Sequence, residues 1–460
     1  MSLRIRVASA AAILITHAVP GTSLAAQAPV PPLNAADTIG RGGDTLGLSF
    51  GVSQRRNRFV FASGKTYNRV EGLPVHFGPV LAAHVGGARF SLEAFGILRS
   101  ANTFEWDSDN RGHVLTGEIR SLRPRGFGLK AATYDIVAPV EDWQIPAGEA
   151  GLATFFLHRD YRDHFGRHGR SATASLFDRR GVVLEGSIAS ERWIAREERQ
   201  VLTVLRNNHR WRPNPEMDEG RANLFTIRGV LDTRNDTRRP STGWLTRIEY
   251  EYGDVDFTQL APTSATVRSA GVVGSEYGRA IMDLRRYNQV SPASQLNFRL
   301  VAGGWLHGDE LPLQRRFSVG GAATIPGAGF RDVNQVPDVF TCSDGNAPPG
   351  SPAQCERVAL VQLEYRHELP YRPGTIFGGT PLRIRSAALT MRPVLVLFTD
   401  AGRGWLVDPP FSGWRTPGIG SFSSDLGAGV DLGLLGTYVA VSLTESGTPV
   451  RFFIRARSRF

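Results

Sequence analysis

The C-terminal stretch RFFIRARSRF, residues 451–460, alternates apolar and basic side chains almost residue by residue. Its even positions are mostly apolar, whereas its odd positions carry four arginines: Arg451, Arg455, Arg457 and Arg459. Successive side chains of a strand point to opposite faces of a sheet, so this stretch predicts a strand with one apolar and one positively charged face. A single strand of this kind also suits a soluble sheet. Whether the chain forms a soluble sheet or a membrane barrel depends on whether the pattern repeats.

The same alternation recurs in residues 244–252, 295–302, 359–366 and 425–432, where apolar side chains face charged, polar or glycine positions. Charged residues of both signs on one face of strand after strand suit a wide aqueous lumen, and the apolar face suits lipid. No run of 18 apolar residues follows the N-terminus, which argues against a helical membrane protein. We therefore predict an all-β fold, a transmembrane antiparallel β-barrel.

Sixteen segments between residues 45 and 460 fit the pattern, so we predict about sixteen strands. Short links at 85–87, 123–125 and near 180 join even to odd strands and are expected to be periplasmic, whereas the long links join odd to even strands and are expected to be extracellular. The long links are 138–167, 193–222 and 307–355. Within the first of them, residues 149–165 predict a short helix packed in the loop and carrying Leu152, Phe155 and Phe156.

The N-terminus has the features of a secretory signal. Two arginines lie within residues 1–6, residues 7–19 are apolar, and Ser23, Leu24 and Ala25 form a small-x-small cleavage site before Ala26. We predict a signal peptide at 1–26, a linker at 27–44 and the barrel at 45–460. Cleavage removes the two arginines and no acid, which lowers the formal net charge from +10 to +8.

The charge distribution and the two cysteines indicate which partners and which kinds of site to expect. The arginines are spread along the predicted strands rather than clustered, which indicates lumen and rim positions and argues against a nucleic-acid partner. Cys342 and Cys355 lie in one segment rich in Pro, Gly and Ser, and export favours a disulfide between them. Only two candidate ligands lie together there, which argues against a metal site.

A turn is predicted by the phrase DTRNDTRRPSTGW, residues 232–244. Asp232 and Asn235 can accept hydrogen bonds from backbone amides, Pro240 fixes φ, and Gly243 leads into the next strand. With Arg234, the phrase resembles the D-x-R…P-x-x-G turn of BamA/TamA-like outer-membrane assembly barrels. YNRVEGL (67–73) and WRPNPEMDEG (211–220) are similar to phrases of members that lack the periplasmic docking (POTRA) domains.

A second resemblance begins at Phe317 and follows the family's F-x-x-G-G-x-x-x-[VI]-R-G-[FY] phrase. It includes Gly320, Gly321, Thr324, Ile325 and Gly327. The resemblance implies that this long sixth loop, between the eleventh and twelfth predicted strands, is folded into the lumen. It also implies partners on the inner wall of the two following strands, at Glu364, Arg366, Asp400 and Gly402.

This phrase departs from the family pattern at two positions. Pro326 stands where the family has arginine and Ala328 where it has an aromatic residue, while Phe330 and Arg331 follow as candidate replacements. We expect the loop to be held chiefly by packing, and by Arg331 where that side chain reaches Asp400 or Glu364. The predicted strand 391–402 is apolar on both faces, which indicates that something packs against its lumen side.

The resemblance implies a role in outer-membrane biogenesis, protein translocation or pore formation. Residues 27–44 are too short for a docking domain, which weakens an insertase role, and a general porin, a passive channel or a surface receptor is the alternative. The histidines at 113, 158, 164 and 168 stand in no recognisable motif, so we predict no catalytic residue, cofactor or enzyme activity. Expected partners are outer-membrane lipids and lipopolysaccharide, the outer-membrane assembly machinery, and a protein substrate of unknown identity.

Phe460 is predicted to be an assembly signal, because a C-terminal aromatic residue on the outward parity resembles the signal read by the assembly machinery. Phe460→Ala should leave the protein as periplasmic aggregates. Cell fractionation and gel mobility with and without heating measure this. A variant that inserts normally and remains heat-modifiable would contradict the role.

Overall fold

The computed structural model describes residues 46–50, 57–63, 67–101, 107–237, 239–262, 273–330, 342, 353–370, 393–407, 422–433, 435–444, 447–456 and 459. For residues 46–50 it describes the backbone alone. All of these residues belong to one unit, Ala35–Phe460. The predicted signal peptide and linker lie outside the described residues, as do Arg331 and Phe460.

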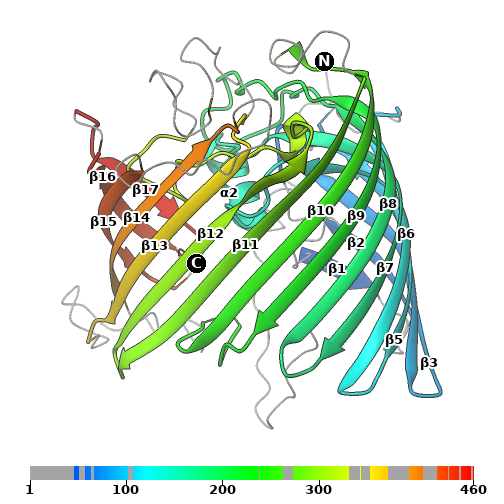
Figure 1. The fold of residues 1–460 in the computed structure, drawn as a ribbon, viewed down its shortest axis with the longest axis horizontal. Coiled ribbons are helices and arrows are strands. Elements are labelled where there is room, and N and C mark those ends of the chain that lie inside the picture. Colours follow the sequence, from blue (N-terminus) through cyan, green and yellow to red (C-terminus); the bar gives the residue numbers. More distant parts are fainter. Residues whose placement is uncertain are drawn as a thin grey trace, which may run out of the picture. The chain divides into compact units, whose positions relative to one another are not determined.

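The described chain forms one sheet of seventeen strands. Each strand pairs antiparallel with the next in sequence, from β1–β2 to β16–β17 (Figure 1). The strands are β1 (Leu46–Phe50), β2 (Arg58–Ser63), β3 (Pro74–Val85), β4 (Ala88–Arg99), β5 (Arg111–Ser121), β6 (Arg125–Pro139), β7 (His164–Asp178), β8 (Val182–Ala195), β9 (Glu219–Asp232), β10 (Gly243–Gln259), β11 (Gly274–Ser291), β12 (Ser294–Gly308), β13 (Arg357–Glu368), β14 (Val394–Trp405), β15 (Ser423–Asp431), β16 (Gly436–Ser442) and β17 (Arg451–Arg455).

The all-β antiparallel class is confirmed, and sixteen of the seventeen strands lie where the alternation predicts them. The additional strand is β2, whose six residues are too few to establish a period. Its presence corrects the predicted order, because the short links now join odd to even strands. The inward-folded loop therefore lies between β12 and β13. Among the described residues, no pairing joins β1 to β17.

The two faces of the sheet differ in the sense that the alternation predicts. On the outer face, large apolar side chains are about half exposed: Phe127 54%, Leu129 51%, Leu184 49%, Ile188 60% and Phe452 62%. On the inner face, charged side chains are buried, among them Arg299, Glu364 and Asp400. This arrangement is the inverse of a water-soluble protein and is the one expected of a barrel wall in lipid.

None of the helices within the described residues is long and apolar enough to cross a membrane.

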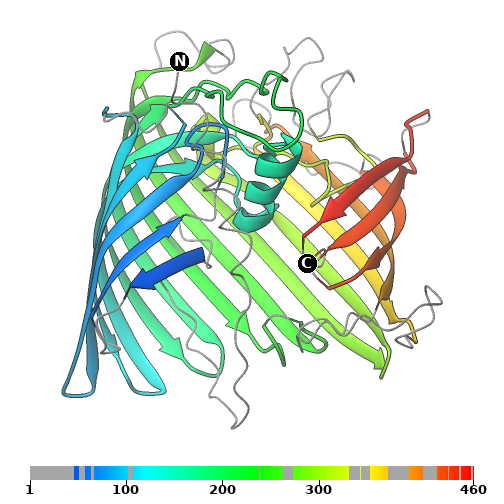
Figure 2. The ribbon, with the colours of Figure 1, turned by 180° about the vertical axis from the view of Figure 1, so that it is seen from behind.

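The inner side of the sheet is occupied by helix α2 (Ala147–Leu157) and by residues 309–330, which we call the inner loop (Figure 2). The inner loop includes the short 3-10 helix η2 (Leu313–Arg315). Its side chains Leu311, Phe317 and Ile325 belong to one buried cluster with Trp193 and Leu360 of the wall. The largest apolar cluster among the described residues therefore lies inside the sheet.

Helix α2 is shorter than predicted and turns a different face inward. Leu152 and Phe156, expected to pack in the loop, are 49% and 37% exposed. The buried residues are Glu149, Ala150, Gly151 and Thr154. Small residues allow the helix to approach the wall closely, and Glu149 meets a buried arginine there, so packing and charge pairing override the apolar pattern.

Neighbouring residues of β6 provide a test of the two faces. Leu129→Arg should lower the free energy of unfolding by about 2–4 kcal/mol, because it places a charge on the lipid face near mid-membrane. Lys130→Arg is the matched control, because Lys130 points to the lumen and should change stability little. Urea unfolding in lipid vesicles measures both, and equal effects would contradict the assignment of the faces.

Candidate functional site

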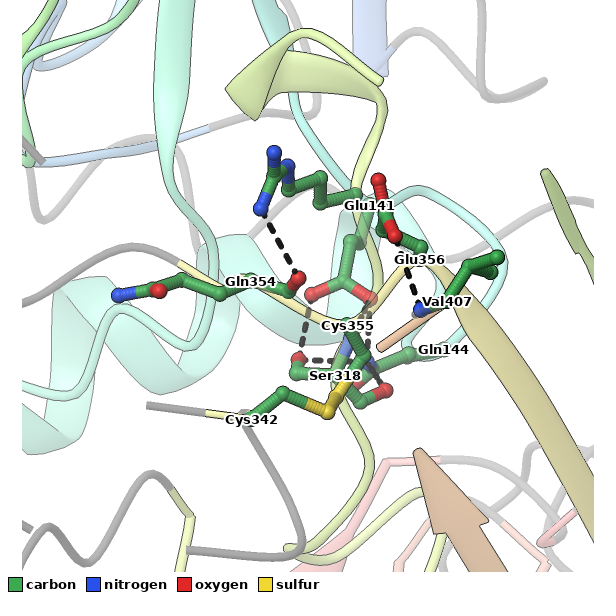
Figure 3. Close-up of a disulfide and its surroundings, with 9 residues drawn as sticks. Glu141, Gln144, Ser318, Cys342, Gln354, Cys355, Glu356 and Val407 are labelled. Carbon is green, nitrogen blue, oxygen red and sulfur yellow. Dashed lines mark hydrogen bonds between the residues drawn. A yellow bond between two sulfur atoms is a disulfide. The ribbon is translucent and has the colours of Figure 1, made fainter. Parts of the chain in front are cut away.

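A disulfide lies beside the base of the inner loop. Cys342 and Cys355 are bonded, which confirms the pairing predicted from the sequence (Figure 3). Phe317 and Cys355 exchange two backbone hydrogen bonds of 2.8 and 3.1 Å. These hydrogen bonds hold Phe317 of the inner loop next to the start of β13, and the disulfide joins the same Cys355 to Cys342.

The link between β6 and β7 is hydrogen-bonded to the inner loop beside the disulfide. The carboxylate of Glu141 accepts hydrogen bonds from the Ser318 amide at 2.8 Å and from its hydroxyl at 2.5 Å. The Gln144 side-chain amide donates to the Ser318 carbonyl at 2.9 Å, and the three residues converge next to the disulfide (Figure 3). Two links far apart in sequence thereby form one buried unit.

An ion-pair network holds the first part of the inner loop, at η2, to the inner side of the sheet. Arg315 donates to Glu251 of β10 at 2.7 Å. The Tyr277 hydroxyl and Arg279 donate to the same carboxylate at 2.8 and 3.0 Å. The Arg315 guanidinium also lies over the Trp193 ring, 4.7 Å from its centroid. Sequence analysis did not identify these residues, because no local pattern connects them.

The tip of the inner loop lies against the inner side of β13 and β15. The Gly327 amide donates to Asp425 of β15 at 2.6 Å, and Gln362 of β13 donates to the Thr324 carbonyl at 2.9 Å. A Cβ on Gly327 would lie 2.6 Å from the Asp425 Cβ and 2.9 Å from the Ser442 amide nitrogen. Only glycine fits at this position, which explains the final glycine of the motif.

The remaining predicted loop residues have distinct positions. Gly320 and Gly321 have φ of +100° and +89°, values that favour glycine and reverse the chain. Ile325 and Pro326 are buried, with Ile325 against Gly402, whose Cβ would lie 3.2 Å from the Ile325 Cδ1 atom. Phe330 packs edge-on against Tyr161. The prediction of a loop folded into the lumen is confirmed.

Asp400 and Glu364 meet an arginine from the C-terminus. Arg459 donates to Asp400 and lies 3.9 Å from Glu364, with its guanidinium 3.5 Å from the centroid of the Phe398 ring. The alternation of residues 451–460 correctly predicted that Arg459 faces inward. The sequence did not indicate its partners, which lie on strands three and four positions away in the sheet.

Two further arginines of the inner wall complete this region. Arg366 pairs with Glu364 at 3.2 Å and with Asp431 of β15. Arg455 pairs with Glu149 of α2 and donates to the Ala322 carbonyl of the inner loop at 3.0 Å. Arg455 therefore joins β17, the helix and the loop tip in one contact.

The doubly apolar strand predicted at 391–402 has an explanation on its inner face. Val396 and Phe398 are buried in a cluster with Tyr438, and Phe453 packs against it. A Cβ on Gly427 would lie 2.0 Å from the Phe398 ring. Aromatic side chains of β16 and β17 therefore pack against the inner face of this strand, and its own Phe398 lies over a glycine of β15.

The turn motif closes the β9–β10 link as its residues predict. Asp232 and Arg234 form an ion pair at 2.7 Å. The Asn235 side-chain oxygen accepts from the amides of Ser241 and Thr242 at 2.9 and 3.1 Å. Gly243 has φ of +109°. Pro240 lies in the same turn, whose hydrogen bonds run among its own residues.

The phrases YNRVEGL and WRPNPEMDEG meet at the end of the sheet where the long links lie. Arg69 donates to Asp163 at 3.0 Å and to Asn214 at 3.1 Å, and it lies 3.1 Å from Asp160. Burial by itself would raise the pKa of Asp160, but the neighbouring His164 and Arg69 hold it well below its ordinary value. Three links are thereby tied together by one buried arginine.

The histidines noted in the sequence have structural surroundings. His164 lies 3.1 Å from Asp160, and His158 stacks on Trp211 with 3.7 Å between ring centroids. His113 and His168 lie edge to face on the outer face of the sheet. Across the part of the chain that the structure describes, no group of three or more His, Cys, Asp or Glu side chains is placed to hold a metal ion.

Removal of the Arg459 charge tests the C-terminal contact. Arg459→Gln should lower the free energy of unfolding by about 3–5 kcal/mol, because it leaves Asp400 and Glu364 as buried charges without their cation. Arg459→Gln with Asp400→Asn should recover much of this loss. Arg125→Gln is the control, because the exposed Arg125–Asp178 pair should contribute less than about 1 kcal/mol. Denaturant unfolding measures all three, and equal effects of the two arginines would contradict a buried contact.

No protein-family model matches this chain, and no curated protein matches it in sequence. Among solved structures, it is similar to BamA from Haemophilus ducreyi lacking POTRA domains 1-3, at 13% identity and a TM-score of 0.48, over 90% of this chain and 74% of that one. CdiB from Escherichia coli has 8% identity and a TM-score of 0.33, over 90% and 67%. The siderophore receptor PirA from Pseudomonas aeruginosa has 10% identity and a TM-score of 0.35, over 88% and 68%.

Proposed function

We propose that this protein is a bacterial outer-membrane β-barrel that acts as a gated pore in translocation or outer-membrane biogenesis, with the inner loop as its gate. The observation that carries the proposal is the loop's course through the lumen. Between Leu311 and Ala328 its side chains are almost all buried, and it contacts β10, β13, β15 and β17. A loop in this position obstructs passage along the inside of the sheet.

The membrane assignment is supported by the faces of the strands. An outer face of half-exposed Leu, Ile, Val and Phe would be costly in water, and an inner face of paired charges needs no contact with lipid. Antiparallel strands with short links at one end and long links at the other are typical of outer-membrane barrels. The secretory features of residues 1–26 agree with export.

A gating role is supported by how the inner loop is attached. Its tip is held by backbone hydrogen bonds at Ala322, Thr324 and Gly327 and by the burial of Ile325. Its base is held by the backbone hydrogen bonds between Phe317 and Cys355, and Cys355 is joined by the disulfide to Cys342. The tip can therefore leave the wall without breaking a strand pairing. The base would remain at the end where the long links lie and would guide its return.

A passive channel is the second candidate. The charged side chains of the inner wall toward the short links favour this candidate. Glu118, Arg120, Arg228 and Glu249 line this part and are 15–28% exposed, which indicates access to water. Mixed charges of this kind suit an aqueous path. The two candidates differ in the conductance of the unmodified protein, which is low for a closed gate and high for an open channel.

Deletion of residues 318–335 tests the gate. Single-channel conductance in planar bilayers should rise several-fold, because the deletion removes the buried tip of the inner loop from the inner side of the sheet. Deletion of residues 206–209, an exposed turn of the β8–β9 link, is the control and should leave conductance unchanged. Equal conductance with and without 318–335 would show that the loop does not obstruct the pore.

A further inference from the structure

The outer face of β7, β8 and β9 carries a group of exposed arginines near the end with the long links. We call Arg170, Arg192 and Arg221 the outer basic cluster; all three are exposed. His168, directly opposite Arg192 in the strand pairing, lies beside them with a side chain 57% exposed. They share the parity of Ala172, Ile188 and Phe225, so they point away from the lumen.

The register places two of these arginines in direct opposition. Arg192 of β8 pairs with Arg221 of β9, and like charges directly opposite each other on one face destabilise a sheet. Within the described residues, no carboxylate lies at ion-pair distance from any arginine of the outer basic cluster. On this face Asp256 of β10 is directly opposite Arg221, Glu219 lies two residues before Arg221 on β9, and Asp135 faces His168 at 3.8 Å. An anion between the arginines would remove the repulsion.

An apolar groove lies directly beneath the outer basic cluster on the same face. It spans β3 to β9, with a volume of about 1080 Å³. One row of paired residues crosses it, from Leu92 through Gly117, Ala131, Ala172 and Ile188 to Phe225. Small residues form its floor and large apolar residues its sides.

The groove and the cluster are adjacent along the strands. Arg170 precedes Ala172 by two positions on β7, a separation of about 7 Å along the strand. Ser190 and Asn223 occupy the same outward row as Arg170, next to Ile188 and Phe225 of the groove. A ligand of this surface therefore has an anionic head toward the long links and apolar chains toward mid-membrane.

We propose that the outer basic cluster and the groove form a binding site for a multiply phosphorylated, multiply acylated lipid of the lipid A class. Three cations on three strands suit more than one phosphate, and a groove across seven strands suits several acyl chains. An acidic protein would use the cluster but would leave the groove without a partner. This inference rests on the proposed outer-membrane location, where the long links face the lipopolysaccharide leaflet.

The experiment compares lipids on the folded, unmodified protein in detergent. Bisphosphorylated lipid A should bind far more tightly than the same lipid without phosphates, as measured by native mass spectrometry. The variant Arg170→Gln, Arg192→Gln, Arg221→Gln should lower the affinity for bisphosphorylated lipid A roughly a hundredfold, since each basic side chain at an anionic lipid surface contributes about a factor of five. Arg286→Gln is the matched control, because Arg286 points outward on β11 over the Trp244 ring, near the short links.

A second variant tests the groove without changing charge. Ala131→Phe with Ala172→Phe should weaken the binding of both lipids, because the added rings fill the floor. Equal binding of phosphorylated and dephosphorylated lipid A to the unmodified protein would overturn the proposal, as would equally tight binding of phosphatidylglycerol. The lipid comparison decides the matter even where a variant does not fold. Cell fractionation tests the outer-membrane location separately, so its failure is distinguishable from failure of the site.

Discussion

The inner wall depends on one constraint, which is that charges enclosed by a lipid-facing sheet must be neutralised inside it. Arg299 is buried and pairs with Asp283, Glu251 is buried and pairs with Arg315, and Asp400 is buried and pairs with Arg459. An unpaired charge at any of these positions would be costly. In two of the three pairs the counter-charge comes from outside the wall strands, so the inner loop and the C-terminus are part of the wall's charge balance.

This balance explains why the lumen is filled rather than open over much of its inner surface. The inner loop supplies Arg315 to β10 and takes Asp425 of β15 as an acceptor, while α2 supplies Glu149 to Arg455. Apolar residues of the loop then fill the space between these anchors. Passage through the lumen requires the loop tip to leave its polar contacts, and this requirement connects the fold to a gating role.

The outer face of the sheet has its own arrangement of charged and apolar side chains, which does not depend on the contacts inside the lumen. Its apolar side chains form the surface expected in lipid, but the register brings Arg192 and Arg221 into opposition above a groove floored by small residues. The wall therefore combines two roles, since its inner charges hold the loop and its outer charges are available to a lipid headgroup.

The sequence by itself determined the class of fold, the two faces, sixteen of seventeen strands, the disulfide and the turn at Asp232–Gly243, because each depends on a period of two or on residues close in the chain. The glycine motif also indicated the loop in the lumen. Only the tertiary structure decided the pairs Arg459–Asp400, Arg69–Asp163 and Arg455–Glu149, whose members are separated by 59, 94 and 306 residues. It also decided which face of α2 is buried. The physical reason is that charge pairing and close packing depend on distance in space, and the order of strands and the course of the links set that distance.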